Sequence, residues 1–383
     1  MKKIAVITAT RAEYGLLIPL IRRITEDAEL ELCLIVTGTH LSDKYGCTIN
    51  AIRKDGFLIA HEIPILEDGN TSFDISLTMA NATKGFAACF RDDRPDMVVI
   101  LGDRTEMLGV AVAAMNERIP IAHIHGGEVT EGAVDDCIRH ALTKISYLHF
   151  TSAEVYRKRV IQMGESPERV FHVGALGLEN IKNVQLFSRK ELEDSIGVVL
   201  GKEYAVVTFH PETLEENTAE SQVEEICAAM EARSEIFFLI TAANADAGGE
   251  NVNRLFMKYV EKCKNACFVY NLGTKFYLSA IKNAAFVLGN SSSGIYEAPA
   301  LGVPTINIGN RQKGRLMAES VINCIPKREE IMRAMEKAEK SEHFISTLFG
   351  DGKTSEKIVK TIKVYLMKKN ISLKKGFYEV KEQ

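Results

Sequence analysis

The chain has 383 residues, of which 46% are hydrophobic and 26% are charged, and its formal net charge is -4. Because a chain longer than roughly 250 to 300 residues usually forms more than one hydrophobic core, we expect two domains. The acidic balance argues against nucleic-acid binding, and no apolar run reaches the ~18 to 20 residues that a membrane span requires.

The first half of the chain alternates apolar strand patterns with amphipathic helical patterns. The predicted strands cover residues 4–8, 30–37, 97–101, 121–124 and 147–151, and the predicted helices between them include residues 11–24, 73–90 and 105–116. A series of this kind predicts an α/β fold with a doubly wound sheet, in which ligands gather at the carboxyl ends of the strands.

The turn after the first predicted strand contains a helix start signal. Thr10 and Glu13 have the spacing of a capping box, which puts Arg11 at the first helical position. Arg11 can reach an anion over the sheet edge from there, and an exposed surface arginine is the alternative. No Gly-x-Gly-x-x-Gly occurs in this turn, which argues against a dinucleotide site.

The turns after the next two strands are dense in titratable residues. Asp103 follows the strand at 97–101, where its capping-box spacing to Glu106 offers an N-cap as the alternative role. His123 lies in the strand at 121–124, and His125, Glu128, Asp135 and Asp136 follow that strand. Carboxylates beside imidazole suit acid-base chemistry, because proximity and burial separate their pKa values. His123 and His125 share one face without fixing a third ligand, so the pattern favours no metal site.

The periodic pattern is lost between residues 174 and 186, where we place the linker, and a second alternating series follows. Its predicted strands cover residues 204–209, 235–241, 268–270, 284–288 and 304–308. We therefore predict an N-terminal Rossmann-like domain at residues 1–185, a C-terminal Rossmann-like domain at 186–365 and a charged tail at 366–383. The eight cysteines contain no Cys-x-x-Cys pair, and the chain starts with a strand pattern instead of a signal peptide, which together predict a cytoplasmic protein with reduced thiols.

The Gly-Asn-Ser-Ser-Ser-Gly turn at residues 289–294 follows an apolar strand and predicts the start of a helix. Gly289 allows close backbone approach, and Ser291 and Ser292 add hydroxyl donors to unpaired first-turn amides, where the helix dipole favours an anion. Plain N-capping by serine is the alternative. Glu297 has no Ser or Thr three positions before it, so it is available to accept hydrogen bonds from ribose hydroxyls. The turn therefore predicts a nucleoside diphosphate site.

Two further turns of the second half carry candidate ligand contacts. His210 directly follows a buried strand at the expected ligand edge, with surface exposure as the alternative. Arg311, Lys313 and Arg315 follow the strand at 304–308, where they either clamp an anion or form a solvated turn.

Seven motifs occur in a fixed order along the chain. They are Thr-Arg-Ala-Glu-Tyr at 10–14, Gly-Asp-Arg at 102–104, His-Ile-His-Gly-Gly-Glu at 123–128, Asp-Asp at 135–136, His-Pro-Glu-Thr at 210–213, Gly-Asn-Ser-Ser-Ser-Gly at 289–294 and Arg-Gln-Lys-Gly-Arg at 311–315. In this order they resemble the hydrolysing UDP-N-acetylglucosamine 2-epimerases of sialic acid (nonulosonate) biosynthesis. The non-hydrolysing branch usually has Arg-Pro-Glu followed by Lys in the first turn, whereas Leu16 and Leu17 occupy that region here, which favours the hydrolysing branch.

The resemblance implies two Rossmann-like domains facing a cleft, as in GT-B glycosyltransferases. It implies that UDP-N-acetylglucosamine and water give N-acetylmannosamine and UDP, without nicotinamide and without an obligatory metal, in a homo-oligomer, either dimer or tetramer. UDP-N,N'-diacetylbacillosamine, the precursor of legionaminic acid, is the close alternative substrate. A GT-B glycosyltransferase and a non-catalytic nucleotide-sugar sensor are the rival function classes.

The resemblance also implies roles for individual residues. Catalytic roles fall to Asp103, Glu128, Asp135, Asp136, His125, His210 and Arg311. Contacts to UDP fall to Arg11, Gly15, His210, Asn244, Gly289, Ser291, Ser292, Glu297 and Arg311. Many members of the family have Glu where His125 stands, so the base at C2 stays open among Glu128, Asp135 and His125.

Overall fold

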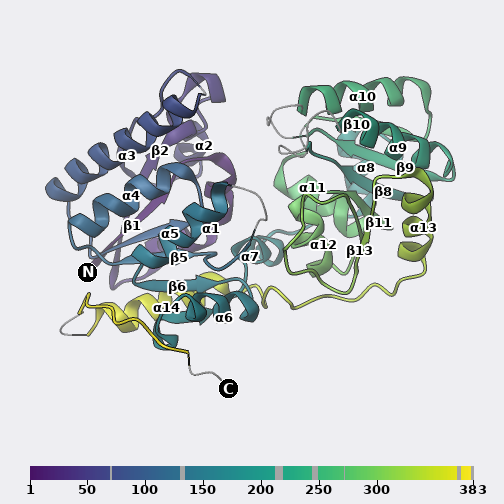
Figure 1. The fold of residues 1–383 in the computed structure, drawn as a ribbon. Coiled ribbons are helices and arrows are strands. Elements are labelled where there is room, and N and C mark those ends of the chain that lie inside the picture. Colours follow the sequence, from purple (N-terminus) through teal and green to yellow (C-terminus); the bar gives the residue numbers. More distant parts are fainter. Residues whose placement is uncertain are drawn as a thin grey trace. The chain divides into compact units, whose positions relative to one another are not determined.

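The computed structural model describes residues 1–69, 71–129, 134–211, 219–243, 249–270, 272–368 and 372–380. The chain forms two compact units, the first made of Met1–Asn180 and Phe349–Gln383 and the second of Ile181–Leu348 (Figure 1). This division differs from the predicted one, because α14 (Thr354–Leu366) packs in the first unit and not in the second. None of the described helices is both long and apolar enough to cross a bilayer.

The described part of the first unit is built on a parallel sheet with the strand order β3-β2-β1-β4-β5-β6-β7. Its strands are β1 (Lys2–Thr8), β2 (Leu30–Thr37), β3 (Ile59–Ile63), β4 (Met97–Leu101), β5 (Ile121–Ile124), β6 (Leu148–Thr151) and β7 (Val170–His172). The chain winds outward from β1 to β3 and then returns to β4, so the winding direction changes between β1 and β4. Ligands of doubly wound sheets bind at this switch point, beyond the carboxyl ends of the strands.

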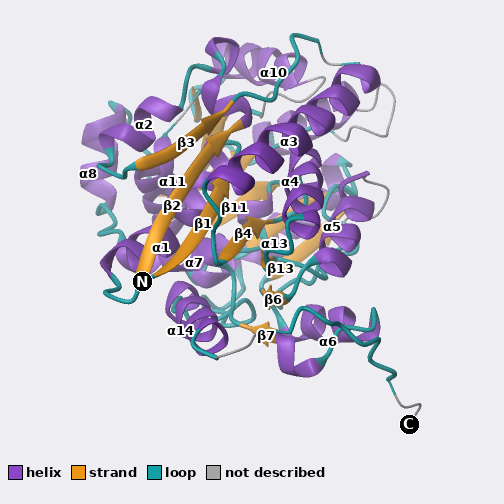
Figure 2. Cartoon of the chain, turned by 90° about the vertical axis from the view of Figure 1, so that its left-hand side faces the viewer, coloured by secondary structure: helices purple, strands orange, loops and turns teal. Residues whose placement is uncertain are grey.

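Helices cover both faces of this sheet. They are α1 (Arg11–Glu26), α2 (Ile49–Lys54), α3 (Ser72–Asp92), α4 (Thr105–Asn116), α5 (Val134–Ile145), α6 (Glu154–Gln162), α7 (Leu176–Asn183), which runs across the boundary between the units, and α14. Successive side chains of a strand point to opposite faces, so Ile4 and Val6 pack in the core beneath α1 and α14. Ala5 and Ile7 pack in the core beneath α3 and α4. Figure 2 shows these two helices beside the strands of the sheet. Burial on both faces explains why β1 reads as a continuous apolar run.

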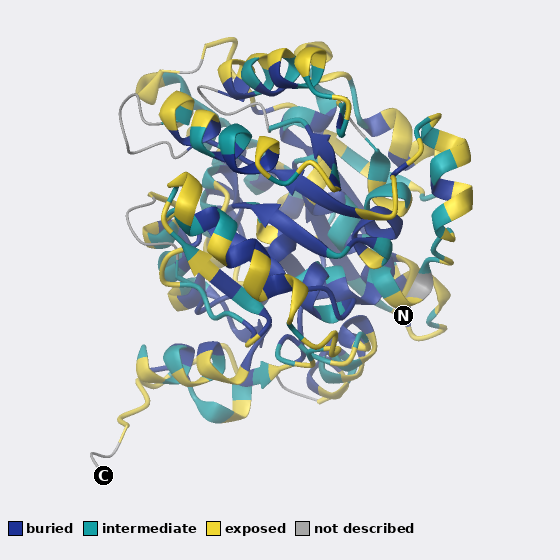
Figure 3. Cartoon of the chain, turned by 90° about the vertical axis from the view of Figure 1, so that its right-hand side faces the viewer, coloured by how far each residue is buried: buried dark blue, intermediate teal, exposed yellow. Residues whose placement is uncertain are grey.

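The second unit repeats the same winding. Its described residues form a parallel sheet in the order β10-β9-β8-β11-β12-β13, with the switch point between β8 and β11. The strands are β8 (Glu203–Thr208), β9 (Ile236–Thr241), β10 (Ala266–Val269), β11 (Phe286–Gly289), β12 (Thr305–Ile308) and β13 (Val321–Cys324). The helices are α8 (Arg189–Ile196), α9 (Ala219–Glu231), α10 (Gly249–Lys262), α11 (Gly273–Asn283), α12 (Glu297–Ala300) and α13 (Arg328–Glu339). In Figure 3, buried strands lie between helices whose outer faces are exposed. The strands β8, β9, β11 and β12 are largely buried, whereas the edge strands β10 and β13 are only partly buried.

The prediction of two doubly wound sheets is confirmed, and the predicted strands at 30–37 and 97–101 coincide with β2 and β4. The prediction that residues 174–186 lack regular structure is wrong, because α7 lies there. This helix is buried on most sides, including Glu179, whose carboxylate accepts hydrogen bonds from the amide (2.7 Å) and hydroxyl (2.6 Å) of Ser355. The helix has only eight residues, which is shorter than the window of roughly 11 residues or more over which a helical period is recognised.

Candidate active site

The turn after β1 forms the predicted capping box. The Glu13 amide donates to Thr10 Oγ1 (3.3 Å), and Glu13 Oε2 accepts from the amides of Thr10 (3.1 Å) and Ala9 (3.0 Å). Glu13 is only 8% exposed, and burial raises the pKa of its carboxyl to about 7, against the opposing charge of Arg104. Arg11 occupies the first helical position and is exposed.

Gly15 lies inside α1, with open space beside its Cα. Its carbonyl accepts a hydrogen bond from Asn180 Nδ2 (2.8 Å), so its backbone helps to join α1 to α7. A contact between Gly15 and a nucleotide stays a proposal.

Arg139 connects three chain segments at the switch point of the first sheet. The N-cap of α4 is Arg104, without a side-chain cap bond, so the alternative prediction of Asp103 as an N-cap is wrong. Asp103 Oδ2 instead accepts from Arg139 Nη2, and Arg139 Nη1 donates to Asp136 Oδ1 (3.1 Å) and to the Glu128 carbonyl (2.8 Å). Arg139 is only 4% exposed, and truncating such a buried cation would leave its carboxylate partners unpaired.

His125 and Glu128 form a second polar group in the turn after β5. Glu128 is 6% exposed, and its Oε1 accepts from Ser152 Oγ (2.6 Å) and lies 3.6 Å from His125 Nδ1. His125 has the left-handed φ of 67°, and its amide donates to the Phe150 carbonyl (2.8 Å). A Cβ at Gly127 would lie 2.5 Å from the Tyr156 carbonyl oxygen, so only glycine fits there. The turn is therefore held in one conformation that brings an imidazole to a carboxylate.

Asp135 lies in the first turn of α5 and is exposed as a residue, although its carboxyl group is partly desolvated. Desolvation and the negative charge of Asp103 raise the pKa of its carboxyl, while the charges of Arg104 and Arg139 oppose that rise. A carboxylate with a raised pKa is a stronger proton acceptor than an ordinary surface aspartate.

His123 does not reach the polar edge with His125. It is fully buried, its Nε2 lies 2.7 Å from the Gly102 carbonyl oxygen, and burial lowers its pKa to about 3. His123 therefore acts as a neutral donor that holds the turn before Asp103. Among the described residues, the one cluster with the spacing of a metal site is Cys33, His61 and Asp93, where Asp93 is also ion-paired with Lys3.

Asn290 connects the turns at the switch point of the second sheet. The His210 amide donates to Asn290 Oδ1 (2.7 Å), and Asn290 Nδ2 donates back to the His210 carbonyl (2.9 Å). The Asn290 carbonyl accepts from Arg311 Nη1 (3.1 Å) and Gln312 Nε2 (2.8 Å). Asn290 is 1% exposed, so this buried residue fixes the turns after β8, β11 and β12 relative to one another.

The serine turn differs from its prediction. A 3-10 helix at Ser292–Gly294 and the four-residue α12 follow β11, and no long helix starts there. The Gly294 amide donates to the Ser291 carbonyl (3.1 Å), and the Ser293 hydroxyl lies 3.0 Å from Ser291 Oγ and 2.6 Å from the Tyr277 hydroxyl. Ser292 is exposed, so its hydroxyl faces solvent. The turn offers hydroxyls and short-turn amides, and the contribution of a long helix dipole is absent there.

Gly289 has a φ of 135°, and a Cβ there would lie 2.0 Å from the Thr208 carbonyl oxygen. Glycine is therefore required by the approach of β11 to β8, and contact with a ligand stays a proposal. Glu297 makes no capping box, and burial raises the pKa of its carboxyl to about 7. Asn244 lies outside the described residues.

Sequence reasoning missed Arg139, Asn290 and Tyr277. Arg139 and Asp136 are three positions apart on one helix, which is the available signal for that pair. The position of Asn290 directly after a strand, inside a glycine-bounded turn, is the corresponding signal in the second half. Tyr277 lies on α11 and reaches Ser293 only through tertiary packing.

An open groove of about 620 Å³ lies elsewhere on the second unit, beside the amino end of β8. Arg233 on its wall is ion-paired with Glu235 (2.5 Å) and Glu339 (2.6 Å). Ligands of doubly wound sheets bind at the opposite edge, so we place the candidate site at the switch points.

Comparison with known proteins gives three findings. The profile of the UDP-N-acetylglucosamine 2-epimerase family matches residues 22–363. The chain is 41% identical over 342 residues to the GDP/UDP-N,N'-diacetylbacillosamine 2-epimerase (hydrolyzing) of Campylobacter jejuni, which covers 89% of this chain and 88% of that protein. It is 39% identical to the polysialic acid biosynthesis protein P7 of Escherichia coli, over 100% of this chain and 98% of that one.

A solved structure of the UDP-GlcNAc 2-epimerase from Neisseria meningitidis bound to UDP-GlcNAc has the same fold. Its TM-score to this chain is 0.79 at 17% sequence identity, covering 95% of this chain and 100% of that one.

Proposed function

The chain belongs to the UDP-N-acetylglucosamine 2-epimerase family, and we propose that it hydrolyses UDP-N-acetylglucosamine to N-acetylmannosamine and UDP with inversion at C2. The observation that supports this most is the carboxylate cluster around Arg139 at the switch point of the first sheet. It occurs in a chain that is 41% identical to a hydrolysing 2-epimerase over 89% of its length.

The reaction couples two bond cleavages, because the C2 proton of a sugar is scarcely acidic. A base removes this proton while the bond from C1 to the diphosphate oxygen breaks and its electrons leave with UDP, so that a double bond forms between C1 and C2. The oxygen of water then adds to C1, and a proton returns to C2 from the opposite face. The site must therefore supply proton transfer at both faces of C2 and stabilise the departing diphosphate.

We assign removal of the C2 proton to Asp135. The raised pKa of its carboxyl favours proton uptake, and the residue is exposed where a sugar can approach. Proton return from the other face falls to the pair of His125 and Glu128, because inversion requires a second group. Asp103 and Asp136, held by Arg139, orient the sugar and the water.

We assign UDP binding to the second unit. Hydroxyl donors, amides and a guanidinium stabilise the charge that develops on a leaving diphosphate, and Glu297 accepts from the ribose hydroxyls. The residues of this proposal are His210, Asn244, Gly289, Ser291, Ser292, Glu297 and Arg311.

Proton NMR of UDP-N-acetylglucosamine with the enzyme in deuterium oxide tests the proposal. The expected product is N-acetylmannosamine carrying deuterium at C2, formed together with UDP. A glycosyltransferase would keep the C2 proton and require an acceptor, and a nucleotide-sugar sensor would leave the spectrum unchanged. Retention of the C2 proton in the product would rule out the proposed chemistry.

UDP-N,N'-diacetylbacillosamine is the second candidate substrate, because the relative from Campylobacter jejuni is named as a GDP/UDP-N,N'-diacetylbacillosamine 2-epimerase. Turnover of the two sugars by the same enzyme preparation decides between them. If the enzyme prefers the bacillosamine derivative by more than about tenfold, equal to about 1.4 kcal/mol, that sugar is the substrate. The proposed elimination mechanism would be unchanged.

We further propose that the enzyme acts as a homo-oligomer in the cytoplasm, in sialic acid (nonulosonate) biosynthesis. The polysialic acid relative supports the pathway, and the eight free thiols support a reducing compartment. Sedimentation of the full chain measures the oligomeric state.

A further inference from the structure

Residues 372–380, which we call the C-terminal strap, lie against the first unit beside α5 and α6. The Tyr378 amide donates to the Gly164 carbonyl (2.9 Å), and the Phe377 ring lies over Gly164 so closely that a Cβ there would be 2.4 Å from a ring carbon. The Lys144 ammonium lies 5.3 Å from the centre of the same ring. The strap is therefore attached by both backbone and side-chain contacts.

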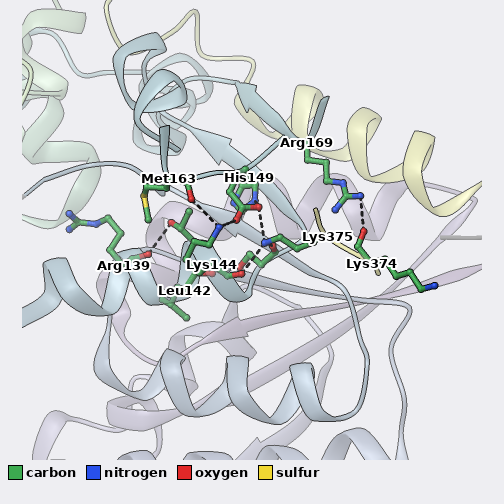
Figure 4. Close-up of polar contacts among 11 residues, drawn as sticks. Arg139, Leu142, Lys144, His149, Met163, Arg169, Lys374 and Lys375 are labelled. Carbon is green, nitrogen blue, oxygen red and sulfur yellow. Dashed lines mark hydrogen bonds and ion pairs between the residues drawn. The ribbon is translucent and has the colours of Figure 1, made fainter. Parts of the chain in front are cut away.

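Lys375 anchors the strap at the carboxyl end of α5. Its ammonium has three protons and lies close to three acceptors, namely the carbonyls of Lys144 (2.9 Å) and Ser146 (2.6 Å) and the Glu165 carboxylate (2.7 Å). The last carbonyls of a helix have no partners within the helix, and a cation there is favoured by the helix dipole. Figure 4 shows Lys375 lying beside Lys144 and His149.

Glu165 links the strap to the sheet. This carboxylate is 1% exposed and lies 2.6 Å from Lys144 Nζ and 3.1 Å from His149 Nε2, in addition to its contact with Lys375. Burial alone would raise its pKa, but the hydrogen bonds from His149, Lys144 and Lys375 hold the pKa at about 2. The ionised Glu165 carboxylate therefore connects the strap to α5 and to β6.

His149 continues the connection toward the candidate active site. It lies on β6 directly opposite His123 of β5, so the two buried side chains point to the same face of the sheet. Burial lowers the pKa of both imidazoles, which keeps them neutral. Because both Nε2 atoms face acceptor oxygens, each carries the proton: His149 donates to Glu165, and His123 donates to the Gly102 carbonyl before Asp103.

Two connections therefore run from the strap to one ion pair. One passes along α5, whose end Lys375 holds and whose Arg139 pairs with Asp103. The other passes through Glu165, His149 and His123 to the turn that carries Asp103. We propose that the C-terminal strap positions the Asp103–Arg139 pair, with Lys375 as its positioning residue. This inference rests on the proposed function, which gives Asp103 its part in turnover.

The test compares variants of the full chain at Lys375. Lys375→Met keeps most of the side-chain length and removes the ammonium, so we expect kcat per UDP-binding site to fall about tenfold, as misplacement of reacting groups costs rate. KM and the Kd for UDP should change less than about twofold, because UDP binding falls to the second unit, and counting sites by UDP titration removes unfolded protein from the comparison. Lys375→Arg should restore most of kcat, and Lys374→Met, at an exposed neighbour, is the matched control.

Hydrogen-deuterium exchange of the same variants provides a measurement that does not need turnover. In Lys375→Met, we expect exchange to rise several-fold in residues 102–106 and 134–139 and to stay unchanged in the second unit. If the rise is confined to the strap, or if kcat per site is unchanged, the strap is an ordinary surface contact and the inference is wrong. If the wild-type enzyme turns over neither UDP-sugar, the proposed function fails, while the exchange data still decide whether the strap holds the ion pair.

Discussion

The two switch points of this protein have the same topology and opposite chemistry. In the first unit, a buried guanidinium gathers carboxylates from separate turns around it. In the second unit, the side chain of Asn290 holds the backbones of neighbouring turns, and hydroxyls surround them. The winding of a sheet thus fixes where a ligand binds, and the side chains of a few turns decide whether that edge moves protons or holds an anion.

The largest expected effect is that of Asp135→Asn, which tests whether proton transfer belongs to the first unit. Loss of the C2 base should lower turnover about 100- to 10,000-fold, the range for removal of a general acid or base, and leave the Kd for UDP unchanged. Steady-state kinetics measure the turnover and titration calorimetry measures the Kd for UDP. The control is Asp96→Asn, at an aspartate that is ion-paired with Lys2 at the amino ends of the strands of the same sheet. Normal turnover in Asp135→Asn would show that Asp135 is not the base at C2, and Glu128 or His125 would then be assigned that role.

Asp103→Asn tests whether the ion pair belongs to the chemistry. We expect turnover to fall by at least ~100-fold at unchanged UDP affinity, because Arg139 would lose a charged partner where we propose that the sugar is oriented. The same assays apply, and near-normal turnover would reduce Asp103 to a structural partner of Arg139.

Ser292→Ala tests whether the second unit binds UDP, and here we expect a loss of affinity instead of a loss of turnover. Loss of an exposed hydroxyl that meets a charged diphosphate should weaken UDP binding by about 1 to 3 kcal/mol, the range for hydrogen bonds to charged groups. Turnover at saturating substrate should fall far less than in the aspartate variants. Ser195→Ala, at an exposed serine of α8, is the control for calorimetry. Equal UDP affinity in Ser292→Ala and wild type would remove this serine from the anion site.

The smallest expected effect is a pH dependence at Glu297. Its carboxyl has a pKa of about 7 because of burial, so the ionised form that accepts ribose hydroxyls accumulates as the pH rises through 7. UDP affinity should therefore increase up to about tenfold between about pH 6 and 8, by linkage between proton loss and binding. The phosphate of UDP titrates in the same range, so the informative quantity is the difference between wild type and Glu297→Gln. If UDP affinity has the same pH dependence in both proteins, Glu297 does not bind the ribose hydroxyls.

Local spacing was sufficient for some features of the sequence and misleading for others. Thr10 and Glu13 form the predicted capping box because both residues belong to one turn. Asp103 and Glu106 have the same spacing, but Asp103 turns to Arg139, which is 36 positions away along the chain. A long-range ion pair of this kind competes with the cap, and spacing alone carries no information about it.

The central strands were predictable because strands such as β4 and β8 are buried and form continuous apolar runs. The edge strands β3 and β13 are only partly buried, and they were not predicted. The helix α7 was not predictable, because its eight residues are fewer than the roughly 11 or more over which a helical period is recognised. The return of α14 to the first unit depends on contacts such as that between Ser355 and Glu179, which only the folded chain brings together. The candidate residues at strand ends were predictable from the winding rule, and the residues that hold them in place were not.

The return of α14 also has a consequence for biosynthesis. The second unit is one uninterrupted stretch of chain, so it can complete its core while the ribosome is still adding residues. The first unit needs Phe349–Gln383, so α1 keeps an apolar surface uncovered until α14 has been synthesised, after the whole of the second unit. A nascent chain that stalls before α14 would carry a complete second unit and an incomplete first unit.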